Sequence, residues 1–493
     1  MFDPRCIDEV GARGRAIRPD VVERGWRADV TKAYRGTILH FTGDPAGGGG
    51  NIHLLEDGAL VVNEQGLINQ VSPWVELPDE LRAEAVQDYC DDLILPGFVD
   101  THIHSGQIDA IASPGGDLRD WLESYVYPAE RRFADEEYAR RAAGDFLDTL
   151  LAAGTTTACV HTTTYKASTD AFFAAAYERD LRMVAGKVLM DAGGRADGGP
   201  VPDDYLDTDV RQAEDDCREL IDAWHGKGRG LYAITPRFGP TSTVEALRMA
   251  GRLFQEYADS GEPIWAQAHL AETRDEVDTV LERFIALKPR SYLDVYDKCG
   301  LVGPRSVWAH CLWPDNVYRS GLGGGRDWRL LKERQAGVAF CPTSNLFLGS
   351  GLFPLARTRR AGVRVGLGTD VGGGTSFSML ETLNEAYKVM ALQGDYLSAL
   401  RGFYLATRGG AEALHLEDRI GGFQPGNEAD FVVLDFAATP LLERRTDAAE
   451  GLVERLFALA TLGDERATKA TYVLGRRAWT SDESHPDHGH PRR

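Results

Sequence analysis

Eight short apolar segments alternate with helix-length segments through the middle of the chain, and this alternation constrains the fold more than any other feature. Helix-like stretches such as ADEEYARRAAGDFLDTLLAA and TRDEVDTVLERFIAL lie between them. This pattern predicts an α/β fold, a (β/α)8 TIM-type barrel with insertions. A doubly wound parallel sheet is the structural alternative. The apolar segments are LILPGFVDTHIH, GTTTACVH, RMVAGKVLMD, GLYAITPRFG, PIWAQAHLAE, SVWAHC, GVAFCP and RVGLGTD.

The two ends of the chain have a different, strand-rich character. YRGTILHFT and GALVVNEQGLINQVSP precede the barrel, and GNEADFVVLD and ATYVLGRRAW follow it, with Gly and Asn turn signals between strands. We expect these ends to pair into one small composite β-sandwich domain. The predicted organisation is an N-terminal extension (1–33), the first β part (34–95), the barrel (96–417), the second β part (418–480) and a disordered tail (481–493).

Charge and cysteine usage exclude several classes of function. The formal net charge of −21 argues against nucleic acid or an anionic membrane as the main partner, since both repel an acidic surface. The seven cysteines are scattered and form no C-x-x-C, so a disulfide framework or zinc ribbon is not expected. The N-terminus has no apolar core of signal-peptide type, and no apolar run nears the length of a membrane span. A cytoplasmic location is expected.

Metal-binding residue types stand at the ends of four predicted strands. His102 and His104 end the first strand, where alternation places them on the same side, although an isolated H-x-H fits a hydrogen-bonded core pair equally well. His269, His310 and Asp370 end the fifth, sixth and eighth strands. Because active sites of such barrels lie at the C-terminal ends of the strands, these side chains should converge. Imidazoles with one carboxylate suit zinc, while iron or manganese stays possible.

The same motifs carry a family resemblance. From PGFVDTHIH through GLGTD to GNEADFVVLD, the chain resembles the amidohydrolase superfamily. The stretches HSGQ, DWLESYVYPAE, GTTTACV, TPRF, HLAET, FCPTSNLFLGSGLF and GTDVGGGTSFSML resemble guanine deaminases within it. The likeness runs from about residue 34 to 479, and only the N-terminal extension and the Gly-rich insertion DAGGRADGGPVPDD depart from it.

The resemblance implies a metal centre and an acid–base pair. It implies one zinc ion per chain, held by His102, His104, His269 and Asp370, with His310 as a ligand or directly beside the ion. Glu272, in HLAE, would carry protons to a ring nitrogen, and Asp370 would orient and deprotonate the water.

Some superfamily members hold two metals with a carbamylated lysine on the fourth strand. Lys187 is the residue to consider for that role, but it lies on the third predicted strand, and TPRF on the fourth carries no lysine. A structural role is therefore expected for Lys187, which favours a single metal.

Substrate-binding residues are expected beside these ligands. Gln107 can both donate and accept along a purine edge, and Arg237 offers donors to a carbonyl. Phe238 could form a wall for a planar ring, although an aromatic residue there is as often part of the core. His161, at the end of the second strand, is a pocket candidate without an assigned role.

The resemblance implies zinc-dependent hydrolytic deamination of guanine to xanthine and ammonia, by a homodimer acting on a small-molecule purine. A sibling aminohydrolase acting on 8-oxoguanine, a triazine or a modified adenosine is the alternative. A catalytically dead relative that serves as a scaffold is a further one, although such relatives usually lose ligands and all five are present here.

Overall fold

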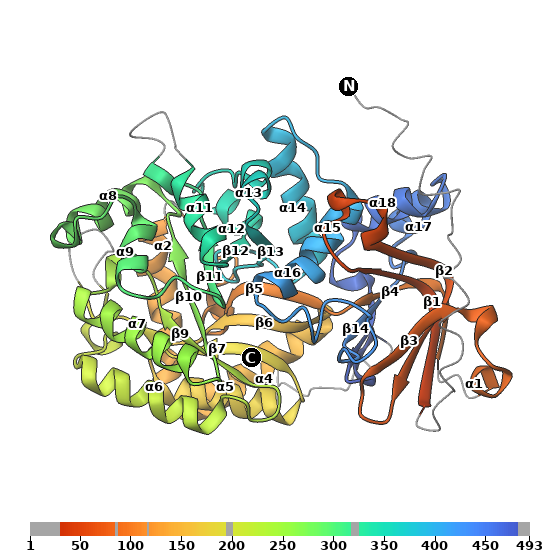
Figure 1. The fold of residues 1–493 in the computed structure, drawn as a ribbon, viewed down its shortest axis with the longest axis horizontal. Helices are drawn as coiled ribbons and strands as arrows, with labels where there is room; N and C mark the ends of the chain where they lie inside the picture. Colours follow the sequence, from red (N-terminus) through yellow and green to blue (C-terminus); the bar gives the residue numbers. More distant parts are fainter. Residues whose placement is uncertain (1–29, 84–86, 116–117, 194–200, 317–324, 482–493) are drawn as a thin grey trace, which may run out of the picture.

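Eight parallel strands form a nearly closed barrel at the centre of the computed structural model (Figure 1). The structure describes residues 30–83, 87–115, 118–193, 201–316 and 325–481. The predicted (β/α)8 barrel is confirmed, with a short extra strand β8 (Val188–Leu189) that pairs with β9. The barrel strands are β5 (Phe98–His104), β6 (Thr155–His161), β7 (Arg182–Gly186), β9 (Leu231–Pro236), β10 (Trp265–Leu270), β11 (Ser306–His310), β12 (Gly337–Phe340) and β13 (Arg364–Leu367).

The first and last barrel strands are joined by individual hydrogen bonds. Thr101 Oγ1 donates to the carbonyl of Leu367 at 2.8 Å. Beyond β13, the backbone N–H of Asp370 donates to the carbonyl of His102 at 2.9 Å, and that of His104 donates to the carbonyl of Val371 at 3.0 Å. These bonds fix the segment after β13 directly against the two histidines of β5.

Helices cover the outside of the barrel (Figure 1). In α4, Asp135 accepts from the backbone N–H of Tyr138 as the N-cap, and buried residues from Ala139 to Leu151 recur every three or four positions, as in an amphipathic helix. Over all the described residues, including those outside the barrel, the α-helices are α1 (Asp79–Ala83), α2 (Leu118–Trp121), α3 (Tyr127–Arg131), α4 (Glu136–Ala152), α5 (Lys166–Glu178), α6 (Val210–Trp224), α7 (Val244–Asp259), α8 (Arg274–Arg283), α9 (Tyr292–Lys298), α11 (Arg326–Glu333), α12 (Pro342–Phe347), α13 (Leu355–Ala361), α14 (Met379–Leu392), α15 (Ala399–Ala406), α16 (Arg408–Ala413), α17 (Pro440–Asp447) and α18 (Leu452–Leu462).

The two chain ends combine into one mixed sheet of seven strands beside the barrel (Figure 1). Strand β1 begins inside the predicted extension 1–33, and β2 begins before the predicted strand GALVV because it pairs with β1 out to Ile52. The rest of the predicted extension and almost all of the predicted tail lie outside the described residues. In sheet order the strands are β16 (Arg476–Thr480), β15 (Thr468–Val473), β14 (Phe431–Leu434), β4 (Gln87–Pro96), β1 (Val30–Phe41), β2 (Ile52–Asn63) and β3 (Ile68–Pro73).

This sheet curls over its own core. The ring of Tyr34 on β1 lies 5.1 Å from that of Tyr472 on β15, although two strands separate β1 from β15 in the sheet. Tyr34 also donates its hydroxyl to the carbonyl of Gly475 at 2.7 Å. The two apolar layers of the expected sandwich are therefore opposite parts of a single curled sheet.

The first predicted barrel segment, LILPGFVDTHIH, is two strands in two different sheets. Strand β4 ends at Pro96 in the outer sheet, and β5 begins at Phe98 in the barrel. The chain crosses between them at Gly97, where a Cβ atom would lie 2.1 Å from Oγ1 of Thr156. An unbroken apolar run does not show such a crossing, which is why the sequence pattern merged the two strands.

Buried ion pairs join the barrel to the curled sheet. Glu428 accepts from Arg182 of β7 at 2.7 Å and also from Arg229. Arg229 in turn donates to Asp430, just before β14. These charges lie at the junction of the two parts of the molecule, away from the ends of the barrel strands that carry the site.

The described residues contain no helix long and apolar enough to cross a membrane. Their six cysteines are free thiols, as the scattered spacing predicts. Cys90 is exposed, and the other five are buried in the fold.

Replacing Gly186 by alanine should destabilise the barrel. Its Cβ atom would lie 1.7 Å from the carbonyl oxygen of Ala233 on β9, a backbone atom that cannot move aside alone. Overpacking of this kind costs about 1–3 kcal/mol or more of unfolding free energy. Urea denaturation measures it, with Gly144→Ala in α4 as the control, since that Cβ would meet nothing closer than Arg179 Nη2 at 3.5 Å. Equal stability of Gly186→Ala and the parent would contradict the packing described here.

Candidate active site

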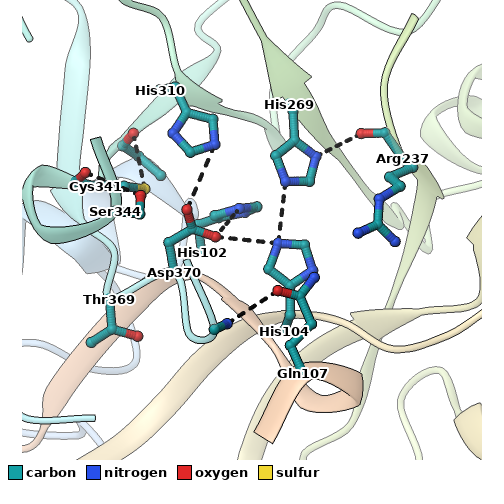
Figure 2. Close-up of polar contacts among 12 residues, drawn as sticks. His102, His104, Gln107, Arg237, His269, His310, Cys341, Ser344, Thr369 and Asp370 are labelled. Atoms are coloured by element: carbon teal, nitrogen blue, oxygen red, sulfur yellow. Dashed lines mark hydrogen bonds and ion pairs between the residues drawn. The ribbon is translucent and has the colours of Figure 1, made fainter. Parts of the chain in front are cut away.

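The five predicted metal-binding side chains meet at the C-terminal mouth of the barrel (Figure 2). Asp370 Oδ1 lies 3.1 Å from Nε2 of His102 and 3.2 Å from Nε2 of His104. Nε2 of His104 is 3.1 Å from Nε2 of His269. On the other side of the carboxylate, Nε2 of His310 is 3.8 Å from Oδ2. Nitrogen and oxygen ligand atoms from four different strand ends therefore surround one small volume.

Unsatisfied nitrogens indicate that this volume suits a metal ion. Nε2 of His102 and Nε2 of His310 are buried without a hydrogen-bond partner among the described residues, although Asp370 is nearby. His102, His269, His310 and Asp370 can direct one ligand atom each at a common ion, and His102 and His104 form a second such group with His161. Nδ1 of His269 lies 2.7 Å from the carbonyl oxygen of Arg237, and donating there leaves its Nε2 free for a metal.

The protonation states also suit a metal. Burial lowers the pKa of His104 to about 4 and that of His310 to about 3, so both imidazoles are neutral at pH 7. Burial alone would raise the pKa of Asp370, but attraction to His102 and contact with His104 outweigh it and hold that pKa well below its usual range. Neutral imidazoles and an ionised carboxylate are the forms that bind metal ions.

His310 differs from the other histidines because its second nitrogen faces an amide. Nδ1 lies 2.9 Å from Nδ2 of Asn345 on α12. If that amide group donates, the imidazole proton sits on Nε2 and can be donated toward Glu272; if the amide is turned to accept, Nε2 is free as a ligand. Both positions predicted for His310, in the ligand set or directly beside it, fit this contact.

Asp100, which the sequence pattern did not single out, anchors the loop that carries Asp370. Its carboxylate accepts from the backbone N–H of His102 and of Thr369, each at 3.1 Å, and from the Thr369 hydroxyl. The side chain is fully buried, which raises its pKa to about 7. Asp100 therefore ties β5 to the residue immediately before Asp370.

Glu272 lies beside the cluster, as expected of an acid–base residue. Its Oε2 is 3.5 Å from Nε2 of His310, and its Oε1 accepts from the hydroxyl of Ser350 at 2.8 Å. Its backbone N–H donates to Glu276 at 2.9 Å, which fixes the turn into α8. Burial and the nearby Asp370 raise the pKa of Glu272 well above its ordinary value. A carboxyl group with a raised pKa keeps its proton to a higher pH than a free glutamate and can pass that proton to a nearby base.

A pocket opens directly above the cluster, and the predicted substrate residues line it. Gln107, Arg237 and Phe238 all face it, together with Glu272. Phe238 serves as both wall and core, since its ring lines the pocket and packs among buried residues near Trp121. A wider cavity adjoins the pocket through shared lining residues, Leu118, Leu122, Phe238 and Leu348. The pocket lining thus combines donors, an acceptor and flat apolar surface.

Arg237 and Gln107 share a partner that the sequence analysis did not assign. Arg237 Nη1 donates to Glu130 Oε2 at 2.7 Å, and Gln107 Nε2 donates to Glu130 Oε1 at 2.9 Å. Glu130 lies on α3, within the motif DWLESYVYPAE, and its side chain is fully buried. The motif was a visible signal, but which of its residues reaches the pocket depends on the path of the chain around α3.

The structure also places His161 and Lys187, the other two residues considered from the sequence. His161 lies beside the cluster, with its ring 4.8 Å from that of His104, and it is not among the residues that line the pocket. Both its nitrogens are buried without a partner among the described residues. Lys187, between β7 and β8, pairs with Asp207. That pairing agrees with the structural role expected for Lys187, and it leaves the amine neutralised by a carboxylate.

Comparison with known proteins agrees with the geometry. Residues 93–478 match the Amidohydrolase family. The chain is 45% identical to guanine deaminase of Escherichia coli K12, over 90% of this chain and 97% of that protein, and 39% identical to a probable guanine deaminase of Deinococcus radiodurans, over 90% and 98%.

Solved structures show the same fold. The structure of E. coli guanine deaminase superposes with a TM-score of 0.81 at 44% identity, covering 91% of this chain and 99% of that one. Guanine deaminase from C. acetobutylicum, solved with guanine in its active site, superposes with a TM-score of 0.78 at 26% identity, covering 91% and 100%. This chain belongs to the amidohydrolase family.

Proposed function

We propose that this protein is a zinc-dependent guanine deaminase that converts guanine and water to xanthine and ammonia. The observation that carries the proposal is the juxtaposition of a buried His/Asp cluster with a pocket whose lining includes Arg237 and Gln107. The 45% identity to an E. coli guanine deaminase supports the same substrate. Guanine bound in the C. acetobutylicum relative supports a purine in this pocket.

One zinc ion per chain is the proposed cofactor, held by His102, His104, His269 and Asp370, with His310 in or beside its ligand set. A zinc ion at this position would supply Lewis-acid chemistry that lowers the pKa of a water molecule to roughly 7. The pairing of Lys187 with Asp207 supports a single ion, since that lysine is not directed at the cluster.

Glu272 and Asp370 carry out the proton transfers. Asp370, held ionised by its imidazole neighbours, orients the attacking water and accepts a proton from it. Glu272 delivers protons to a ring nitrogen and to the departing amino group. The water oxygen forms the new C–O bond and the C–N bond breaks, so one water proton leaves with ammonia and the other stays on the purine ring.

Arg237 recognises the carbonyl edge of the substrate. Arg237 has five N–H donors and uses one of them in its bond to Glu130, so another can donate to the carbonyl oxygen at position 6 of guanine. Adenine carries an amino group there and would face the guanidinium with another donor. Phe238 and the apolar lining accommodate a flat ring.

Guanine should be preferred over adenine by at least about a thousandfold in kcat/KM, because sites built on a substrate hydrogen bond reject analogues lacking it by roughly 10⁴–10⁵-fold. Arg237→Ala should lose roughly 2–5 kcal/mol of transition-state binding on guanine. It should gain little on adenine, since the reacting carbon must still reach the metal. Arg237→Lys keeps the charge but loses the planar guanidinium, so its kcat/KM for guanine should lie between those of the parent and Arg237→Ala.

Ammonia release from a panel of purines, pyrimidines and triazines tests this proposal, with guanine, adenine and ammeline as its central members. A wild-type preference for adenine, or undiminished guanine turnover in Arg237→Ala, would remove its physical basis. Preference for 8-oxoguanine, a triazine or a modified adenosine would instead identify a sibling aminohydrolase.

The family resemblance also suggests a homodimer, and the scattered free thiols favour a reducing compartment such as the cytoplasm. Light scattering of the purified protein tests the first suggestion. Localisation of the protein in its native cell tests the second.

A further inference from the structure

Glu130 is a buried carboxylate beside the pocket. It accepts hydrogen bonds from three separate parts of the chain. Its Oε2 accepts from Arg237 Nη1 at 2.7 Å and from the hydroxyl of Tyr205 at 2.6 Å. Its Oε1 accepts from Nε2 of Gln107 at 2.9 Å. The carboxylate has no exposed surface, so these bonds replace its hydration. Glu130 itself is not among the residues that line the pocket.

The amide of Gln107 is held in one orientation by two neighbours. Its Nε2 donates to Glu130, and its Oε1 accepts from the backbone N–H of Gly372 at 3.1 Å. A reversed amide would set its oxygen against the carboxylate and its NH₂ against the N–H of Gly372. In the observed orientation one N–H and one lone pair remain for a ligand. Glu130 therefore decides what hydrogen-bonding pattern Gln107 presents.

Arg237 depends on the same carboxylate. The Arg237 side chain is 3% exposed, and a buried cation is costly unless it is paired. Glu130 supplies the paired charge, and the ring of Tyr127 lies 5.5 Å from the guanidinium carbon. Because Nη1 donates to Glu130 and the ring of Tyr127 lies alongside, the guanidinium is anchored at that end.

We infer that Glu130 is a specificity-determining positioning residue that sets the donor and acceptor pattern of Arg237 and Gln107 toward the substrate. The inference rests on the proposed function, since the pattern matters only if these two residues bind the purine. Glu130 acts through them and touches no reacting atom. Tyr205 supports it from outside the pocket by donating to the same oxygen as Arg237.

Glu130→Gln is the most direct test because it preserves shape and removes the charge. The carboxamide can still accept from Arg237 and Tyr205 through its oxygen, but its NH₂ then faces the NH₂ of Gln107. Gln107 must turn away, and Arg237 loses its counter-charge. Hydrogen bonds to charged groups correspond to roughly 10- to 150-fold in an equilibrium constant, so kcat/KM for guanine should fall by about that factor. The fall should appear mainly in KM, because substrate binding is what the carboxylate organises.

KM separates positioning from a general folding defect, since a smaller amount of correctly folded enzyme lowers the apparent kcat and leaves KM unchanged.

Tyr205→Phe removes one donor to Glu130 without altering the pocket lining, and it should raise KM for guanine by roughly 2- to 10-fold. Glu428→Gln is the matched control, because Glu428 also accepts from two arginines but lies at the junction of barrel and sheet. Its KM should equal that of the parent.

The assay is steady-state guanine deamination by the zinc-loaded full-length protein, with zinc content measured for each variant. A raised KM in Glu130→Gln with parental zinc content supports the inference, and a KM within about twofold of the parent overturns it. Should Glu130→Gln not fold, Tyr205→Phe decides in the same way, by a raised or an unchanged KM. Absence of guanine turnover in the wild type would instead refute the proposed function, which keeps the two failures distinct.

Discussion

Asp370→Ala is expected to abolish deamination and to lower the metal content. Asp370 is the only carboxylate of the proposed ligand set, and one of its oxygens lies within 3.2 Å of both His102 and His104. Its removal takes away a ligand, the negative charge that offsets the metal, and the group that orients water. His104→Ala should have the same result, because its Nε2 lies between Asp370 and His269.

Elemental analysis and an ammonia assay on the same preparations measure these effects. Asp327→Asn is the control, since Asp327 is a buried acid held by Ser291 and by the backbone of Asp315, outside the cluster. It should keep the parental metal content. Two metals per chain in the wild type would contradict the mononuclear assignment and would direct attention to the group of His102, His104 and His161. Full metal retention in both ligand variants would contradict the assignment as well.

Glu272→Gln is expected to keep zinc and substrate but to lose most turnover. The amide preserves the shape of the side chain, and its oxygen can still accept from Ser350. It cannot carry the proton that the raised pKa of Glu272 allows the carboxyl group to hold. Positioned acid–base groups contribute roughly 10²–10⁴-fold in rate, and kcat should fall by at least that range because the same residue serves more than one transfer.

The comparison of kcat with KM and zinc content separates lost chemistry from lost binding. Unchanged KM and zinc with a depressed kcat would place Glu272 in the chemical step. Activity within about threefold of the parent would remove it from the proposed mechanism, since such a loss is far below the range for a positioned acid–base group.

The barrel and the cluster could be read from the sequence because both depend on local pattern. Strand alternation put His102 and His104 on one side, and the rule that active sites lie at strand ends brought His269, His310 and Asp370 to them. The structure places all five at the same barrel mouth (Figure 2). Their roles toward a metal stay predictions.

Features that depend on the path of the chain could not be read in the same way. Glu130 lies on α3, and nothing in its local spacing shows that it meets Arg237 and Gln107. The local sequence does not distinguish Asp100 from the other polar residues of β5. Its role is visible only in the structure, where the segment after β13 donates to it. The crossing at Gly97 is equally invisible, because the apolar character of β4 and β5 is continuous. For Glu130 and Asp100 the contacts that matter join segments that are distant in sequence.

Metal-dependent guanine deamination is measured most directly by the joint yield of xanthine and ammonia from guanine, with and without the metal. We expect the zinc-loaded protein to form the two products in equal amounts, chelation to stop the reaction and added zinc to restore it. Undiminished turnover after the metal has been removed, or a loaded enzyme that releases no ammonia from guanine, would contradict this expectation.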